Sequence, residues 1–159
     1  MMAVLGDDRF GARCLGGNRF QLTGCAYRPV ADLCILPCGL AGQQAWICRP
    51  SRALIVRGRL AGDEPCVLRL GDGVVSPAIG GLDLTVAGAV VALRVICDGA
   101  MTYVSGRLRL DMATSVVLLA GVAADRAELD DRLCELAVQL VRPGGYETLQ
   151  SAGARRYVP

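Results

Sequence analysis

The side chains that could do chemistry at neutral pH are arginines, carboxylates and thiols, because the 159-residue chain contains neither histidine nor lysine. All 17 basic residues are arginines. A histidine triad, a histidine metal site, a phosphate-loop lysine and a lysine Schiff base each need a side chain that this sequence lacks. These absences exclude more classes of enzyme than any motif in the sequence suggests.

The arginines are most concentrated between residues 49 and 69. Arg57 and Arg59 stand two positions apart, so on a strand they share one face and could contact phosphate or an acidic protein. The alternative is that they form the solvated face of an antiparallel sheet. The net charge of +2 and the aromatic content of 4% give little general support for nucleic-acid binding. The candidate anion contacts are Arg49, Arg52, Arg57 and Arg59.

The eight cysteines lie mostly within apolar runs, and none forms a Cys-x-x-Cys pair. The one close pair, Cys34 and Cys38, flanks Pro37 without a second pair at zinc-finger spacing. We therefore expect no metal and no cofactor. The sequence favours free, buried thiols in a reducing compartment, and nothing but an arginine or a helix start could lower a thiol pKa.

Two carboxylates, Asp72 and Asp98, precede glycine and could stand at loop tips. Asp-Gly is first of all a hairpin-turn signal, and Ser105-Gly106 does not fit the strand-turn-helix setting of a nucleophilic serine. We therefore assign no catalytic residue.

The elements that would position these side chains are mainly strands. Apolar and polar residues alternate with a period of two in much of the chain, as in 82–86, where Asp83 and Thr85 lie opposite three apolar side chains. Turn signals separate the runs at short intervals, which indicates an antiparallel β-sandwich or barrel of about 8–10 short strands. The expected strands are 19–23, 32–36, 44–48, 53–60, 65–70, 82–86, 89–97, 104–112 and 115–122.

One helix is expected over about 125–142. Asp125 can cap it, Glu128 can complete a capping box, and Pro143 with the following glycines ends it. Its apolar stripe could be a lid on the open end of the sheet structure. Alternatively, the width of that face could dock a second subunit or a partner helix. The candidate interaction residues are Leu129, Leu133, Leu136, Leu140 and Val141.

We expect a single domain over 1–159, with a β core at about 12–123 and a loose tail at 143–159. The longest apolar run, 113–124, is too short to span a bilayer, and the first residues lack the pattern of a signal peptide. We therefore expect an intracellular protein, cytoplasmic or nuclear. The use of arginine in place of lysine is typical of a GC-rich coding sequence, and the cysteine content favours a large DNA virus as its source.

Four short motifs follow one another along residues 19–146: Ile35–Gly39, Gly73–Ser76, Val104–Arg107 and Gly144–Tyr146. In this order they resemble a degenerate version of the trimeric dUTPase family. The family's catalytic aspartate is replaced by Ser76, and its Tyr-Arg-Gly and Pro-Arg-Ser-Gly motifs are absent. Viral relatives of this fold have lost the enzyme activity and act through protein contacts, and the resemblance implies the same here.

Together these observations predict a non-enzymatic interaction or assembly protein with a protein partner, self-association, or both. Two alternatives stay open. One is a nucleotide-hydrolysing enzyme resembling dUTPase, and the other is a protein that contacts nucleic acid through arginines.

Overall fold

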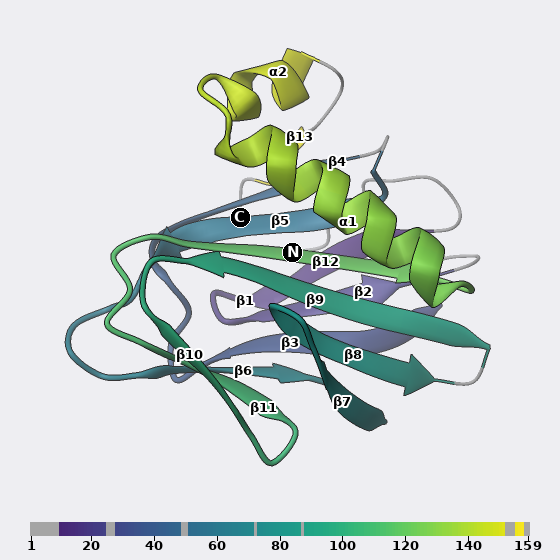
Figure 1. The fold of residues 1–159 in the computed structure, drawn as a ribbon, viewed down its shortest axis with the longest axis horizontal. Coiled ribbons are helices and arrows are strands. Elements are labelled where there is room, and N and C mark those ends of the chain that lie inside the picture. The colour runs from purple at the N-terminus through teal and green to yellow at the C-terminus, as the bar shows by residue number, and fades with distance from the viewer. Residues whose placement is uncertain are drawn as a thin grey trace.

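The computed structural model describes residues 10–24, 28–48, 51–71, 73–86, 88–151 and 155–157. Two antiparallel sheets lie face to face, and a long helix covers the outer face of one of them (Figure 1). The mainly β fold class with a C-terminal helix is confirmed. The structure is a sandwich and not a closed barrel, because each sheet retains two edge strands.

The first sheet has six strands. Its β10 edge lies beside β11, and its β1 edge lies beside β2. In spatial order the strands are β1 (Gly11–Gly16), β2 (Arg19–Thr23), β3 (Pro29–Leu36), β6 (Cys66–Leu70), β11 (Arg107–Asp111) and β10 (Ala100–Val104).

The second sheet has seven strands, with β12 at its centre between β5 and β9. In spatial order the strands are β13 (Arg155–Tyr157), β4 (Ala41–Cys48), β5 (Ala53–Arg59), β12 (Val116–Ala123), β9 (Ala89–Cys97), β8 (Gly81–Val86) and β7 (Val74–Ala78).

The period-two pattern places one apolar face of each sheet in the main core. Leu33 and Leu68 from the first sheet and Leu93 and Leu118 from the second are fully buried. Burying a leucine side chain stabilises the fold by roughly 1.5–3 kcal/mol, so this core dominates the favourable free energy of folding.

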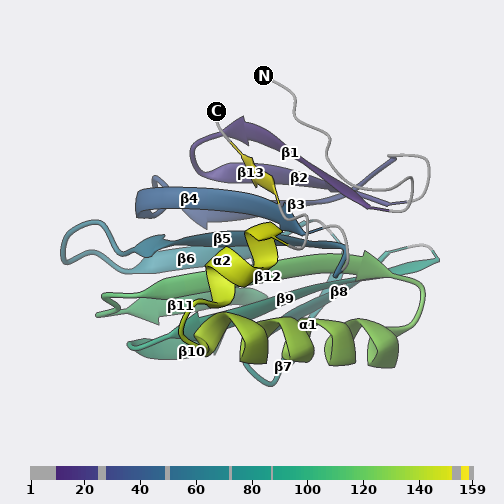
Figure 2. The ribbon, with the colours of Figure 1, turned by 90° about the horizontal axis from the view of Figure 1, so that it is seen from above.

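The helix α1 (Arg126–Val141) builds a second core on the outer face of the seven-stranded sheet. Asp125 caps it by accepting a hydrogen bond from the backbone N–H of Ala127 at 2.9 Å. Gly121 of β12 lets the helix approach closely, since a Cβ there would lie 2.9 Å from Leu129 Cδ1. Seen from above, the axis of α1 is roughly aligned with β9 and β12, which run antiparallel to each other (Figure 2).

The position of α1 corrects one expectation. The helix was expected to close the open end of the sheet structure, but it lies on a sheet face. The sheet's outer face carries Trp46, Ile55, Ala92 and Leu119, which need a cover, and this requirement fixes where the helix packs.

Four strands were not predicted: β1, β7, β10 and β13. The expected strand 104–112 is shorter, because Ser105 and Gly106 form the turn of the β10–β11 hairpin. Both turn residues have positive φ, at 50° and 78°, as a two-residue hairpin turn requires. The segment 143–159, expected to be a loose tail, contains a second helix, α2 (Gly145–Ser151), and β13.

Candidate interaction surfaces

The predicted interaction face of α1 is largely used inside the chain. Leu129, Leu133, Leu136 and Leu140 are buried against the seven-stranded sheet, whereas Val141 is 66% exposed. Of the five predicted interaction residues, only Val141 is therefore accessible to a partner. The outward side of the helix instead presents Cys134 and Val138.

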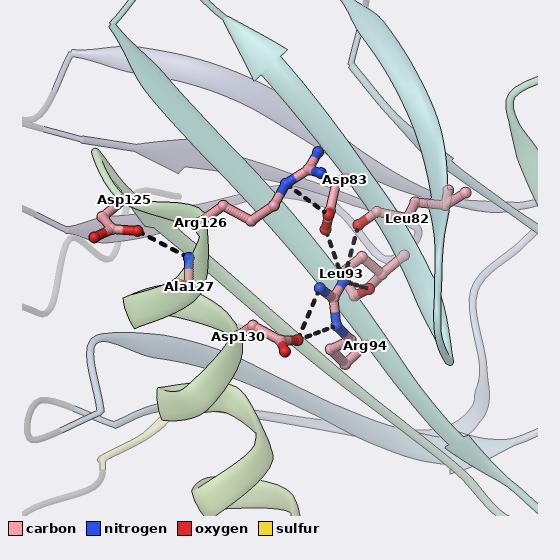
Figure 3. Close-up of polar contacts among 8 residues, drawn as sticks. All are labelled: Leu82, Asp83, Leu93, Arg94, Asp125, Arg126, Ala127 and Asp130. Atoms are coloured by element: carbon pink, nitrogen blue, oxygen red, sulfur yellow. Dashed lines mark hydrogen bonds and ion pairs between the residues drawn. The ribbon is translucent and has the colours of Figure 1, made fainter.

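A charged cluster fastens the start of α1 to the sheet (Figure 3). Arg94 of β9 donates to Asp83 Oδ1 at 2.8 Å and to Asp130 Oδ1 of the helix at 3.0 Å. Arg126 pairs with the other oxygen of Asp83 at 3.2 Å. Arg94 loses hydration by burial, but its hydrogen bonds to Asp83 and Asp130 outweigh that loss and raise its pKa. Every charge here has a partner, so the cluster positions the helix.

The three predicted anion contacts that the structure describes, Arg52, Arg57 and Arg59, do not form one site. Arg52 precedes β5 and pairs with Glu128 of α1 at 3.3 Å. Arg57 and Arg59 lie at the other end of β5; seven residues of strand separate Arg52 from Arg59 by about 23 Å. Arg49 lies outside the described residues.

Arg57 contacts two aromatic rings, those of Trp46 and Tyr146, which the sequence pattern did not bring together. Its guanidinium carbon lies 4.8 Å from the ring centroid of Trp46 and 4.0 Å from that of Tyr146. Its Nε also donates to Gln44 Oε1 at 2.9 Å. Such cation–π contacts contribute about 0.5–2 kcal/mol each, depending on desolvation, and they fix the direction of the guanidinium.

Arg57 and Arg59 line a concave basin of about 520 Å³ on the outer face of the seven-stranded sheet. The floor and walls include Thr114, Ser115 and Tyr146, and no carboxylate is among the lining residues. Burial raises the pKa of Tyr146, and the nearby Arg57 charge acts in the opposite direction. We call this site the arginine basin.

The thiols and the Asp-Gly carboxylates are not arranged as a catalytic or metal site in the described ranges. No group of three cysteine, aspartate or glutamate side chains there could hold a metal ion. Burial raises the pKa of the Cys66 thiol to about 11. Asp98 accepts hydrogen bonds from the hydroxyl of Thr114 and the backbone N–H groups of Thr114 and Ser115, and these lower its pKa. Asp72 and Cys25 lie outside the described residues.

The four sheet edges differ in how well they are protected against pairing with another strand. β1 carries Arg13 and an irregular register after Cys14. β7 contains Pro77, and β13 is three residues long. Charge, bulges, proline and shortness are the usual means of blocking an edge. β10 has none of the first three: Ala100–Gly106 holds no charged residue and no proline, and its register with β11 is regular.

The free edge of β10 presents both backbone groups and apolar side chains. In a two-residue hairpin the pair beside the turn, Val104 and Arg107, is hydrogen-bonded, and hydrogen bonding alternates from there. The N–H and C=O groups of Met101 and Tyr103 therefore point away from β11. Their side chains share the face of the buried Leu108 and Leu110, yet they remain 38% and 39% exposed.

The signal for this edge was present in the sequence. The stretch 100–104 has strand-forming residues between two turn signals, Asp98-Gly99 and Ser105-Gly106. The apolar alternation of the next strand also extends back to Val104, so the pattern alone does not separate the two strands of the hairpin. Only the structure shows that β10 has no neighbour on its outer side within the described residues.

The motifs that resemble dUTPase lie on separate elements. Ser76 is on β7, whereas the ring of Tyr146 contacts that of Trp46 of β4 in a tilted arrangement, with ring centroids 5.2 Å apart. β7 and β4 are five strand positions apart, which is about 24 Å. Within one chain these residues do not line a common site.

No protein-family model and no curated protein matches this chain. Within the part of the chain that the structure describes, no helix combines the length and hydropathy needed to cross a bilayer.

Proposed function

We propose that this chain is a non-enzymatic assembly protein that associates with a second copy of itself through the edge strand β10. The observation that carries this proposal is the unprotected edge, with free backbone donors and acceptors and two half-exposed core-facing side chains at Met101 and Tyr103. An exposed edge of this kind binds another strand by extending the sheet.

The sequence and hydrogen-bonding pattern of β10 favour pairing with β10 of a second copy of the chain. Antiparallel pairing about a two-fold axis at Thr102 would place Met101 of one copy opposite Tyr103 of the other. Both residues have outward backbone groups, so this register makes a hydrogen-bonded pair. The absence of charge in Ala100–Gly106 means that two copies meet without repulsion.

The proposal agrees with two expectations from the sequence, a viral structural or host-interaction role and a resemblance to non-catalytic relatives of the dUTPase fold. A pair of five-residue strands buries less than the roughly 1,200 Å² of a standard interface, so we expect a dissociation constant in the micromolar range. Such an interaction suits reversible assembly.

Paired charge substitutions test the register. Met101→Glu and Tyr103→Arg each place an uncompensated charge in the pairing, so each variant alone should be monomeric by light scattering where the wild type is dimeric. In an equimolar mixture, Glu of one chain faces Arg of the other and the two remaining positions keep Met and Tyr. We therefore expect the mixture to form a heterodimer.

The control is Val74→Glu on β7, a neighbouring exposed apolar position outside the β10 pairing, 77% exposed. It should remain dimeric. A wild-type chain that stays monomeric at about 100 µM, well above a micromolar constant, would overturn the proposal. So would a mixture of the two β10 variants that fails to associate although both are folded.

A further inference from the structure

We propose that the arginine basin binds a phosphate monoester, with Arg57 and Arg59 holding the phosphate and the apolar wall holding the organic group. The site is separate from β10, because it lies over β5 and the end of α1 on the outer face of the other sheet. The inference therefore does not depend on self-association.

The charge of the basin matches a dianion. Arg57 and Arg59 contribute two guanidinium groups from Cα positions about 7 Å apart along the strand, and the lining adds no carboxylate. Six other arginines of the described residues are paired with a carboxylate: Arg19, Arg52, Arg94, Arg109, Arg126 and Arg132. A phosphate monoester carries about 1.5–2 negative charges at pH 7 and offers three acceptor oxygens, which suits two arginines.

Arg57 is already in a fixed position. Its ring contacts with Trp46 and Tyr146 and its 2.9 Å hydrogen bond to Gln44 hold the side chain before any ligand arrives. Less side-chain entropy is then lost on binding. The planar guanidinium also matches the geometry of a phosphate, with which it can form two parallel hydrogen bonds.

The basin also contains an unused donor. The Tyr146 hydroxyl is buried and donates to no acceptor within the described residues. A buried donor without an acceptor is destabilising, and an oxygen of a bound ligand would satisfy it. Ser115 adds a hydroxyl to the same lining.

One feature opposes an anion here. The C-terminal end of α1 borders the basin at Leu140 and Val141, and a helix C-terminus carries about half a negative charge. Two full guanidinium charges exceed it. The same two residues, with Ile96 and Val117, supply an apolar wall beside the charged end. The volume of about 520 Å³ exceeds what a bare phosphate needs and leaves room for a ring.

Trp46 provides the measurement, because it is the single tryptophan of the chain and stacks on Arg57. The full chain is titrated at constant ionic strength with phenyl phosphate, inorganic phosphate and sulfate while tryptophan fluorescence is recorded. We expect a saturable change, with phenyl phosphate binding at least tenfold more tightly than sulfate. Adenosine monophosphate and a phosphotyrosine peptide then distinguish a free nucleotide from a modified protein as the source of the group.

Two matched variants locate the site. Arg59→Gln removes one guanidinium but leaves the Trp46–Arg57–Tyr146 stack, and it should weaken phenyl phosphate binding tenfold or more. Arg107→Gln, on the other sheet, should leave binding unchanged. Thermal unfolding of both variants verifies that they are folded. Equal binding of sulfate and phenyl phosphate, no saturable response, or equal effects of the two variants would each overturn the proposal.

Discussion

Asp83 lies on a strand that was predicted correctly, yet its side chain is buried where the pattern suggested exposure to solvent. Alternation along 82–86 places its side chain opposite the main core, which suggested a solvated position. The residue is nevertheless only 3% exposed, because α1 covers that face and brings Arg126 toward it. A buried carboxylate is costly to leave unpaired, and here Arg94 and Arg126 compensate it from two different elements.

Removing the Asp83 carboxylate should therefore lower the free energy of unfolding substantially. Asp83→Asn leaves Arg94 buried with only Asp130 as a charged partner, and we expect a loss of about 3 kcal/mol in the free energy of unfolding. Asp130→Asn breaks the more exposed half of the cluster and should cost under about 1 kcal/mol. Urea unfolding of both variants checks the contrast; equal losses would mean that Asp83 is not the buried anchor.

Asp98 should give the chain a measurable acid sensitivity. The Thr114 hydroxyl, followed by the backbone N–H of Ser115, lowers its pKa in the folded state. A lowered folded pKa stabilises the protein above the unfolded pKa of about 3.9, and this contribution is lost as pH falls through the folded pKa.

The measurement is the urea midpoint between pH 6 and pH 3 for the wild type and Asp98→Asn. The variant has no carboxylate to protonate at this position, so its midpoint should fall less over that interval. All other carboxylates are shared, so the difference between the two slopes isolates Asp98. Parallel slopes would contradict the assignment.

At the scale of elements, the sequence pattern predicted most strands and the helix, because their positions depend on neighbouring residues. Period-two alternation, continuous apolar runs and the turn signals between them identified nine strands, and Asp125 with Pro143 marked the ends of α1 closely. Three of the missed strands have a weak signal in isolation: β7 contains proline, β1 contains glycines, and β13 is three residues long. The signal of β10 is present but merges at Val104 with that of the next strand. The position of α1 could not be predicted from its apolar stripe, because the outer face that receives it is assembled from β4, β5, β9 and β12, and only β12 is adjacent to the helix in sequence.

The arginine basin, too, could be predicted only in part from the sequence. The period of two correctly placed Arg57 and Arg59 on one face, since both line the basin. The sequence could not show that Tyr146 returns from the far side of α1 to stack on Arg57. Nor could it show that Arg52, a near neighbour in sequence, turns to Glu128 at the other end of the sheet.

The attachment of α1 can be tested directly. Leu133 is fully buried in the second core, and Leu133→Ala should cost about 2–5 kcal/mol in the free energy of unfolding. Val138→Ala on the exposed side of the same helix should change it by less than about 0.5 kcal/mol. Urea unfolding followed by Trp46 fluorescence is suited to the comparison, because Trp46 belongs to that core. A neutral Leu133→Ala would show that the helix is not packed as described.

At the scale of the whole molecule, the protein has three layers, and the seven-stranded sheet is the middle one. The seven-stranded sheet contributes one face to the main core and the other to the core under α1. This explains why its central strands read as nearly continuous apolar runs, whereas the strands of the first sheet alternate. The two proposed binding regions lie on parts that this arrangement leaves uncovered, the β10 edge and the end of the helical layer.

β12 lies at the centre of the seven-stranded sheet, but it is synthesised after the strands on both sides of it. The ribosome makes the β4–β5 hairpin and the β7–β9 meander first, but the strand that joins them, β12, is completed only at residue 123. Until then β5 and β9 each expose the edge that β12 later occupies. A nascent chain must therefore keep these two edges from pairing with other strands while it is incomplete, and this requirement follows from the topology itself.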